Sequence, residues 1–538
     1  MGSEQGLIQR GKLTLKRMRV LIGLVFLVSC ALPKPVNNQA PITTSEPIIS
    51  TSTPFSIDNT PQDLTPLPTS GITPQPTISS QATPEDSNSN PIEVVNELTH
   101  YELDAVFNYF KHSLSVTESI RYMNNTPDTL TDLILVVEPN RREGGFNMES
   151  LTWKTGESIE EFELTSDQLH ILLPQPLAPG EGIKIIIRYA LELPEIPPPS
   201  DTSRPTPYGY TERQTNIVDW YPYIPPYRSG EGWLVHQNWW FGEHQVFDMA
   251  DFNIRFSLAD PIQDLVIAAS APVKQDGDTY VYQLEAARSF ALSASNQYLV
   301  QTKNSGDVTI YSYSFSYDEY AGEEVLQNTA DALQLYSQLI LPYPHASLSV
   351  VEADFLDGME YDGLYFLSRG FYNLYDGTPK GYLTFIAAHE TAHQWWYGLV
   401  GNDQALEPWL DEALCTYMEH IFYENIYADY PSASHQSLVD WWWYYRVNFY
   451  EPDGWINGTI YDFARFRPYR DAVYLNGAKF LNDLRVLIGD QAFFAFLREY
   501  ANQNKTQIAT ATGFFSILKE NTSEDLDGLI DEYFQEVK

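Results

Sequence analysis

The residue pattern with the clearest chemical meaning is the run His389-Glu390-Thr391-Ala392-His393. On a helix, positions four apart lie on one face, so both imidazoles can reach one metal ion. Zinc takes nitrogen and oxygen ligands tetrahedrally, and a catalytic site leaves one position for water. Glu390 stands beside the first histidine, where it can accept a proton from the water that such a metal acidifies. The pattern therefore predicts metal-assisted hydrolysis, with His389 and His393 as ligands and Glu390 as the general base.

A third ligand is expected at Glu412 in the run EPWLDEALCTYMEHIFYE, with eighteen residues between it and His393. Glycines between the two runs are suited to ending the first helix, and Pro408 suits the first turn of a second. An antiparallel second helix would place Glu412 opposite the histidines. Two histidines and one glutamate are a known catalytic zinc set, so one Zn²⁺ per chain is expected. The alternative is a packing helix, because the apolar residues 383–388 would be buried whatever the helix binds.

The two runs together resemble those of the gluzincin metallopeptidases of the aminopeptidase N and leukotriene-A hydrolase family, which carry a WLNEG-type second helix. The resemblance implies that His389, His393 and Glu412 bind zinc and that Glu390 is the general base. It also implies a thermolysin-like catalytic domain that hydrolyses peptide bonds.

A segment about thirty residues upstream, Asp357-Gly358-Met359-Glu360-Tyr361, resembles the G-x-M-E-N exopeptidase motif of the same family. The resemblance implies that Glu360 holds the free α-amine of the substrate. A carboxylate there would fix one ammonium group and so select the first peptide bond. The sequence departs from the motif at Asp357 and Tyr361, and the alternative is an acidic turn residue after a strand.

Two further substrate contacts follow from the resemblance. The run VYLNGA at residues 473–478 resembles the family's Y-x-K-G-A segment, although Asn476 replaces the lysine. This implies that the Tyr474 hydroxyl donates to the oxyanion of the intermediate, with a merely packed tyrosine as the alternative. The family's β domain also supplies a polar side chain to the substrate amine. Gln214, eight residues before Pro222, is the nearest candidate.

The elements that position these residues are indicated by changes of pattern along the chain. Short β-branched or aromatic segments bounded by turn residues predict an antiparallel β-sandwich-like domain over residues 98–316. From 317 to 538 the apolar residues follow a helical period, which predicts an α-rich catalytic domain with C-terminal helices and a multidomain α+β fold. The expected helices are 317–341, 383–397, 408–427, 435–448, 471–487, 491–501 and a tail after 512, with a strand at 347–351.

The N-terminal part of the chain has a different composition. Residues 1–29 carry a basic region, a short apolar run and a small residue, in the order of a secretory signal. The ending LVSC resembles a bacterial lipobox, which implies cleavage before Cys30 and lipidation of that cysteine. Residues 30–97 are rich in Pro, Ser and Thr and predict a disordered tether. An extracytoplasmic protein held to the cell membrane by a lipid is expected, and an ordinary signal peptide is the alternative.

Charge and cysteine content exclude several classes of protein. The chain has 32 Lys plus Arg against 71 Asp plus Glu, a formal charge of −39, so nucleic acid is not an expected partner. Two cysteines exclude a disulfide scaffold and a zinc site built on a cysteine cluster. A hydrophobic fraction of 43% is that of a packed globular protein.

These observations predict a surface-anchored zinc metallopeptidase that removes N-terminal amino acids from peptides. One alternative is a zinc endopeptidase, or another hydrolase, on the same core. The other is a surface binding lipoprotein whose site is idle. Peptides are the expected partners, and the sequence leaves the side-chain preference and the oligomeric state open.

Overall fold

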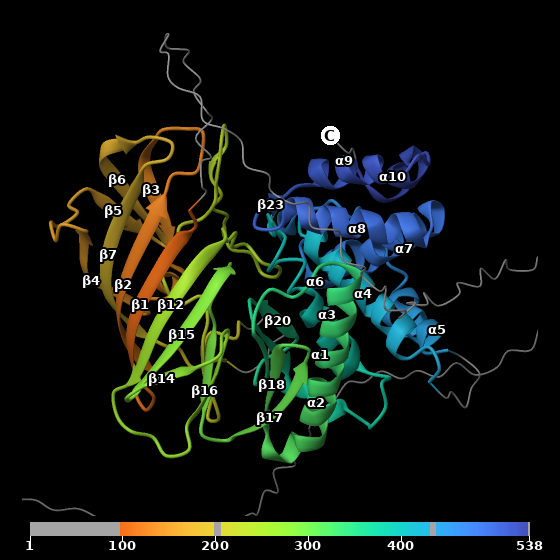
Figure 1. Cartoon of the computed structure of the whole chain (residues 1–538), viewed down its shortest axis with the longest axis horizontal. Helices are drawn as coiled ribbons and strands as arrows, with labels where there is room; N and C mark the ends of the chain where they lie inside the picture. The colour runs from red at the N-terminus through yellow and green to blue at the C-terminus, as the bar shows by residue number, and fades with distance from the viewer. Residues whose placement is uncertain (1–96, 198–205, 431–436, 536–538) are drawn as a thin grey trace, which may run out of the picture. The chain divides into compact units, whose positions relative to one another are not determined.

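The computed structural model describes residues 97–197, 206–430 and 437–535. The predicted signal peptide, Cys30 and nearly all of the predicted tether lie outside the described residues. The described chain begins with sheets and ends with helices, which confirms the predicted α+β fold class (Figure 1). Within these described ranges, no helix combines the length and the apolar character that a membrane span requires.

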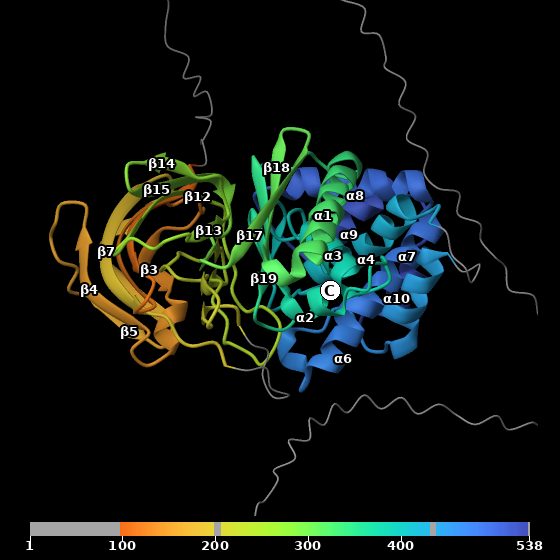
Figure 2. The same ribbon diagram turned by 90° about the horizontal axis from the view of Figure 1, so that it is seen from below.

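A seven-stranded sheet dominates the first region, and Figure 2 shows that it is strongly curved. Side chains alternate between more and less buried along β1 (Thr99–Asn108) and β2 (Ser113–Met123), because successive residues of a strand point to opposite faces. All neighbouring strands are antiparallel except β1 and β12, which pair in parallel. In spatial order the strands are β14 (Lys274–Asp276), β15 (Thr279–Ala287), β12 (Ala250–Leu258), β1 (Thr99–Asn108), β2 (Ser113–Met123), β7 (Gly182–Glu192) and β4 (Phe146–Trp153).

Smaller sheets pack with the large sheet around one hydrophobic core, to which strands of both contribute. This arrangement places the inner face of each sheet out of water, as in a β-sandwich. The smaller sheets consist of β3 (Leu130–Val136), β6 (Gln168–Leu177) and β5 (Phe162–Thr165); β13 (Val266–Ala269), β16 (Leu292–Ser295), β9 (Thr215–Ile217) and β8 (Gly209–Tyr210); and β10 (Tyr227–Arg228) with β11 (Gly232–Trp233).

One core position of this region carries an acid. Glu118 lies on β2 between the buried residues Val116 and Ile120 and is itself fully buried. Burial raises the pKa of Glu118 well above its ordinary value, and the nearby Tyr189 hydroxyl offsets only part of that effect. The folded protein therefore holds this carboxyl in its neutral form at a pH where the unfolded chain would ionise it.

Replacing Glu118 by Gln is expected to raise stability, and the gain should grow from pH 5 to pH 8. A carboxyl whose pKa is raised by folding supports the fold below its unfolded pKa, and this support is lost as the pH rises towards the folded value. Glutamine keeps the shape without the ionisation, so we expect a gain of about 1–3 kcal/mol at pH 8. Thermal unfolding of both proteins at the two pH values measures it. An equal difference at both pH values would contradict the assignment.

The second region is built on a five-stranded sheet in the order β17-β18-β19-β21-β20. Helix α1 (Glu319–Leu339) packs on β17 and β18 (Figure 1). Two strands of this sheet precede residue 317, so the sheet combines segments from both predicted domain ranges. Its strands are β17 (Tyr298–Ser305), β18 (Val308–Phe315), β19 (Ser347–Ala353), β20 (Gly358–Tyr361) and β21 (Leu364–Ser368).

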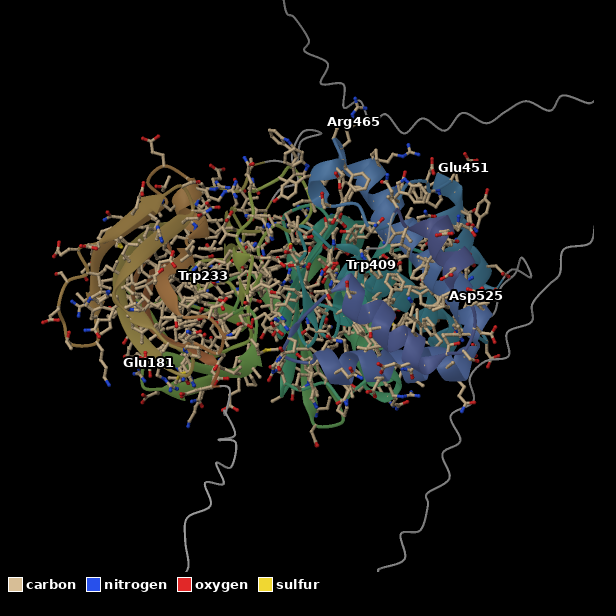
Figure 3. All side chains as sticks on the ribbon, turned by 90° about the horizontal axis from the view of Figure 1, so that it is seen from above. Glu181, Trp233, Trp409, Glu451, Arg465 and Asp525 are labelled. Atoms are coloured by element: carbon tan, nitrogen blue, oxygen red, sulfur yellow. The ribbon has the colours of Figure 1, made fainter. Side chains whose placement is uncertain are left out.

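The helices that follow agree with most of the expected ranges, although α2 (Arg369–Leu374) and α6 (Phe466–Arg470) were not expected and the helix expected at 471–487 begins as a π-helix. The helix expected at 383–397 ends at Ala392, because the chain turns after His393. In the described part of the segment expected at 435–448, the α-helix covers only Leu438–Trp442 and a π-helix follows it over Trp443–Val447. Helix α4 (Trp409–Ile426) is buried on almost every side, which is typical of a core helix. At its start Trp409 lies among the helices, whereas Glu451 and Arg465 are exposed (Figure 3).

The helices are α2 (Arg369–Leu374), α3 (Tyr382–Ala392), α4 (Trp409–Ile426), α5 (Leu438–Trp442), α6 (Phe466–Arg470), α7 (Gly477–Ile488), α8 (Asp490–Asn504), α9 (Ala511–Asn521) and α10 (Asp527–Tyr533). Two π-helices cover Trp443–Val447 and Asp471–Asn476, and 3₁₀ turns lie at Glu138–Arg141, Ser316–Asp318, Asn448–Tyr450 and Ile460–Asp462. The short strands β22 (Gly401–Asn402) and β23 (Ile508–Ala509) pair in parallel.

Candidate metal centre and active site

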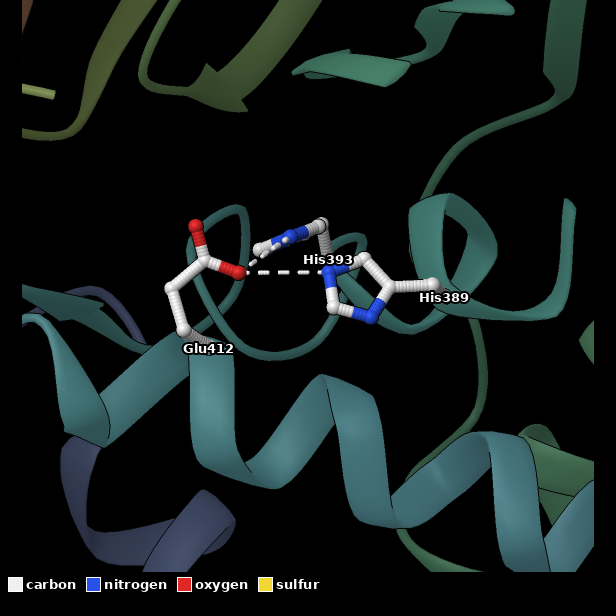
Figure 4. A group of neighbouring side chains, drawn as sticks. All are labelled: His389, His393 and Glu412. Atoms are coloured by element: carbon white, nitrogen blue, oxygen red, sulfur yellow. Dashed lines mark hydrogen bonds and ion pairs between the residues drawn. The ribbon is translucent and has the colours of Figure 1, made fainter. Parts of the chain in front are cut away.

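The three predicted metal ligands converge where α3 packs against α4. His389 Nε2 lies 3.2 Å from Glu412 Oε2, and His393 Nε2 lies 3.6 Å from the same oxygen (Figure 4). Donor atoms around one tetrahedral zinc ion are about 3.3 Å apart, given bonds of 2.0–2.2 Å. The spacing and the chemistry of the three donors therefore fit one such ion.

The Nδ1 atom of each histidine has a hydrogen-bonding acceptor, which leaves the Nε2 atom free to bind a metal. His389 Nδ1 lies 3.0 Å from Glu419 Oε1, and His393 Nδ1 lies 3.0 Å from the carbonyl oxygen of Trp396. When Nδ1 donates to these acceptors, the lone pair of each Nε2 points towards Glu412. The sequence reasoning missed Glu419. Its signal was the spacing of seven residues after Glu412, two helical turns along the same face.

Glu419 is fully buried and receives three hydrogen bonds besides that of His389. Arg446 donates from Nε at 2.9 Å and from a terminal nitrogen at 2.8 Å, and Trp442 Nε1 donates at 2.9 Å. Burial alone would raise the pKa of Glu419, but the Arg446 charge holds it below its ordinary value. Glu419 is therefore an ionised, fixed partner that orients the ring of His389.

The electrostatics of the cluster favour a cation between the donors. Burial alone would lower the pKa of His389, but hydrogen bonds with Glu412 and Glu419 raise it to about 9. Burial alone would raise the pKa of Glu412, but hydrogen bonds from the two histidines hold it below its ordinary range. Several carboxylates buried close together are stable only when positive charge lies beside them, and a divalent ion would supply that charge.

The carboxylate of Glu390 lies beside the three candidate metal ligands. It lines the same cavity as the three donors and is buried. Within residues 97–197, 206–430 and 437–535, its Oε2 has no hydrogen-bonding partner. Burial raises the pKa of Glu390 to about 8 against the opposing effect of the two histidines. Such a side chain can take up and release a proton near neutral pH.

The backbone of β20 passes close to the Glu390 side chain at Gly358. A Cβ atom at this position would overlap the Glu390 carboxylate. Asp357, immediately before it, has a φ of 80°, a conformation that non-glycine residues rarely adopt. The segment identified by its resemblance to an exopeptidase motif therefore forms one wall of the metal centre.

Glu360, on β20, enters the same cavity from this wall. It is buried, and its Oε1 accepts a hydrogen bond of 3.1 Å from Gln404 Nε2. Gln404 also donates to Asp411 Oδ2 at 2.9 Å, so it joins Glu360 to the start of α4. Gln404 was missed by the sequence reasoning, since it lies in the connection between α3 and α4 and belongs to no motif.

Tyr474 reaches the metal centre from the second π-helix. Its hydroxyl donates to Glu412 Oε1, and its ring stacks on His389 with centroids 6.0 Å apart. A π-turn in a helix is frequent at functional sites, because it shifts one side chain out of the helical pattern. The structure therefore places a hydroxyl donor beside the metal ligands.

The structure does not bring Gln214 to the site. Its Nε2 donates to the Tyr298 hydroxyl at 2.7 Å, and its Oε1 accepts from the Asp354 backbone at 2.8 Å. It is buried and lines neither of the cavities described below. We therefore correct the assignment of Gln214. It is a structural residue that ties β9 to the end of β19, because its side chain points into that junction.

The donors, Glu390, Glu360 and Tyr474 all line one cavity of about 500 Å³. This volume is within the range of small-molecule and peptide sites. Apolar and aromatic side chains that are largely exposed also line it, at Leu374, Tyr382 and Phe449. The chemistry that this arrangement permits is hydrolysis assisted by a metal and a carboxylate base.

Residues 324–533 match the Peptidase family M1 domain. This part of the chain is therefore similar to the M1 peptidase domain. The range contains all three donors, Glu390, Glu360 and Tyr474. The resemblance to the gluzincins of the aminopeptidase N type, made from the motifs, is thereby confirmed.

The M1 domain has curated relatives in bacteria and plants. Aminopeptidase N of Lactococcus lactis subsp. lactis is 24% identical over 272 residues, which are 46% of this chain and 30% of that protein. Aminopeptidase M1-D of Oryza sativa subsp. japonica is 25% identical over 224 residues, 39% of this chain and 25% of that protein. The alignments thus span less than a third of the length of these relatives.

Solved structures of an M1 zinc metallopeptidase from Deinococcus radiodurans share the fold. One crystal structure of a point mutant aligns with a TM-score of 0.56 at 17% identity, covering 82% of this chain and 95% of that one. A second, described as bound to a Tyr-Ser-Ala substrate, aligns with a TM-score of 0.54 at 18% identity, covering 79% and 90%. The sheet-rich region and the M1 domain therefore occur together in a known two-part fold.

Proposed function

We propose that the protein is a zinc-dependent aminopeptidase that removes N-terminal amino acids from peptides. The observation that carries the proposal is the single cavity in which His389, His393 and Glu412 meet both Glu390 and Glu360. A metal site with a base explains hydrolysis of a peptide bond. A buried carboxylate on the adjoining wall explains why the first bond would be chosen. The aminopeptidase relatives and the zinc metallopeptidase fold support the same reading.

In this proposal, Glu390, Tyr474 and Glu360 each have a separate role in the reaction. A bound zinc ion would acidify the attacking water and polarise the scissile carbonyl. Glu390 takes the proton of the attacking water and passes it to the leaving nitrogen. Tyr474 turns its hydroxyl from Glu412 to the oxygen on which negative charge develops. Glu360 holds the α-ammonium group, which fixes the first carbonyl beside the metal donors.

The test compares a peptide that has a free amine with its N-acetylated twin. We expect the free peptide to be cleaved after its first residue and the acetylated one to be left intact. Glu360→Gln removes the charge that holds the ammonium, so kcat/KM for the free peptide should fall roughly 10–100-fold. Liquid chromatography with mass spectrometry identifies the bond cut. Equal cleavage of both peptides by the zinc-loaded protein would make it an endopeptidase, and no cleavage of a broad peptide library would make it a binding protein.

We also propose that the chain is an extracytoplasmic lipoprotein anchored to the cell membrane through Cys30. The support is the order of basic, apolar and LVSC segments at the start of the sequence. When the full chain is expressed in a bacterium that processes lipoproteins, it should partition into detergent, and its N-terminal peptide should carry acyl mass on Cys30. Cys30→Ala should move the protein to the aqueous phase. An unmodified N-terminus in the wild type would refute the anchor.

A further inference from the structure

A second cavity, of about 460 Å³, lies on the other side of the strand that carries Glu360. Met359, Glu360 and Tyr361 all line it, whereas the metal donors, Glu390 and Tyr474 line only the first cavity. Glu360 and no other residue is shared by the two linings. The carboxylate assigned to the substrate amine therefore stands at the boundary between them.

This position determines what can enter the second cavity. In the proposed reaction, Glu360 holds the ammonium while the scissile carbonyl lies among the metal donors in the first cavity. The α-carbon of the first residue carries both the ammonium and the side chain, so that side chain starts next to Glu360. The peptide beyond the scissile bond continues on the side of the metal. The second cavity is therefore free to receive the first side chain.

The inner part of this cavity is acidic. Asp219 lines it and is half-buried, and its carboxylate interacts electrostatically with Glu138 and Glu360. Burial, followed by the charge of Glu138, raises the pKa of Asp219 to about 7. Its only hydrogen bond recorded among the described residues is a long one, 3.4 Å from the Tyr361 hydroxyl. A cation placed beside such a buried carboxyl stabilises its ionised form.

The backbone at Asp219 supports a functional role. Its φ is 48°, in the left-handed region that costs energy for a residue with a side chain. Residues held in this way are enriched at binding sites, where the surrounding structure imposes the conformation. Here the turn directs an acidic side chain into the cavity lining rather than into solvent.

Among the described residues, neither arginine of the same lining forms an ion pair with Asp219. Arg141 is already paired, with Glu138 at 3.4 Å and with Asp167 at 3.6 Å. Arg142 is exposed. Trp239, which also lines the cavity, offers an apolar surface suited to the methylene stem of a long side chain. The lining therefore combines an apolar wall with carboxylates at the end near Glu360.

We propose that the second cavity binds the side chain of the first substrate residue and that Asp219 selects a cationic one, arginine or lysine. The inference rests on the proposed aminopeptidase function and adds the substrate class. Asp219 is a specificity-determining residue in this proposal, because the chemistry itself takes place in the first cavity.

The test uses arginine and citrulline, which have the same shape but differ in charge. For the zinc-loaded full chain we expect kcat/KM for arginyl-aminomethylcoumarin to exceed that for the citrullinyl compound by roughly 10-fold or more. Asp219→Asn should bring the ratio close to one, chiefly by lowering kcat/KM for the arginyl compound. Asparagine also tolerates a positive φ, so the turn is preserved. Asp264→Asn is the matched control, since Asp264 has a φ of 58°, is exposed and lines neither cavity.

A binding measurement separates this inference from the proposed function. Calorimetry of the wild type with argininamide and citrullinamide should show tighter binding of argininamide, and Asp219→Asn should remove the difference. If the wild type hydrolyses nothing but shows this binding pattern, the aminopeptidase proposal fails and the selectivity stands. An unchanged arginine preference in Asp219→Asn, an equal loss on both compounds, or no preference in the wild type would overturn the inference.

Discussion

Glu390→Gln is expected to lower the kcat for aminoacyl-arylamides by roughly 10²–10⁴-fold, the usual contribution of a general base, with one zinc still bound per chain. The Glu390 carboxylate lines the cavity beside the three donors without being one of them, and its Oε2 has no partner among the residues that the structure describes. Glutamine keeps its size but cannot accept the proton of the attacking water. Activity assays paired with metal analysis measure both quantities.

The control for this prediction is Glu520→Gln, which removes an exposed carboxylate of α9 that lines neither cavity. Its kcat and zinc content should equal those of the wild type. A zinc-loaded Glu390→Gln protein with the full kcat would remove Glu390 from the role of base. A zinc-free one would show instead that Glu390 helps to hold the metal.

Glu412→Gln is expected to weaken zinc binding by more than about 100-fold, beyond the effect usually seen for a partner outside the ligand set. Glu412 Oε2 is the atom that both histidine Nε2 atoms face, at 3.2 and 3.6 Å. The variant keeps the shape of the side chain but loses the negative charge that favours a divalent ion. Titration against a chelator of known affinity measures the change, and activity should disappear with the metal.

Glu532→Gln provides the matched control here, because Glu532 is an exposed residue of α10 and lines neither cavity. Circular dichroism shows whether each variant folds, which separates loss of the metal from loss of the fold. Zinc affinity that is unchanged in a folded Glu412→Gln protein would leave the histidine pair without its third ligand and would refute the metal centre.

The side chains of the metal centre are held by a second set of hydrogen bonds. The ring of His389 is held by Glu419, and Glu419 is held by Arg446 and Trp442 from the segment after α4. Gln404 holds Glu360 in the same way from the connection before α4. These contacts join five parts of the chain around one small volume, so the position of each ligand depends on several elements at once.

The sequence by itself determined the features that depend on local periodicity. His389 and His393 share a helix face because four residues make about one turn. The helical period likewise predicted most of the helices, and the motifs identified the M1 domain. The turn after His393 was not foreseen, because it depends on the Tyr397–Val400 contact and its neighbours rather than on helix propensity.

Only the tertiary structure decided how segments distant in sequence meet. The separation of His393 and Glu412 depends on how α3 packs against α4, and Gln404, Glu419 and Arg446 gain their roles only through that packing. Gln214 was misplaced for the same reason, since spacing along the chain does not state which way a buried amide points. The second cavity lies between β20 and loops of the first region, so no single stretch of sequence could have revealed it.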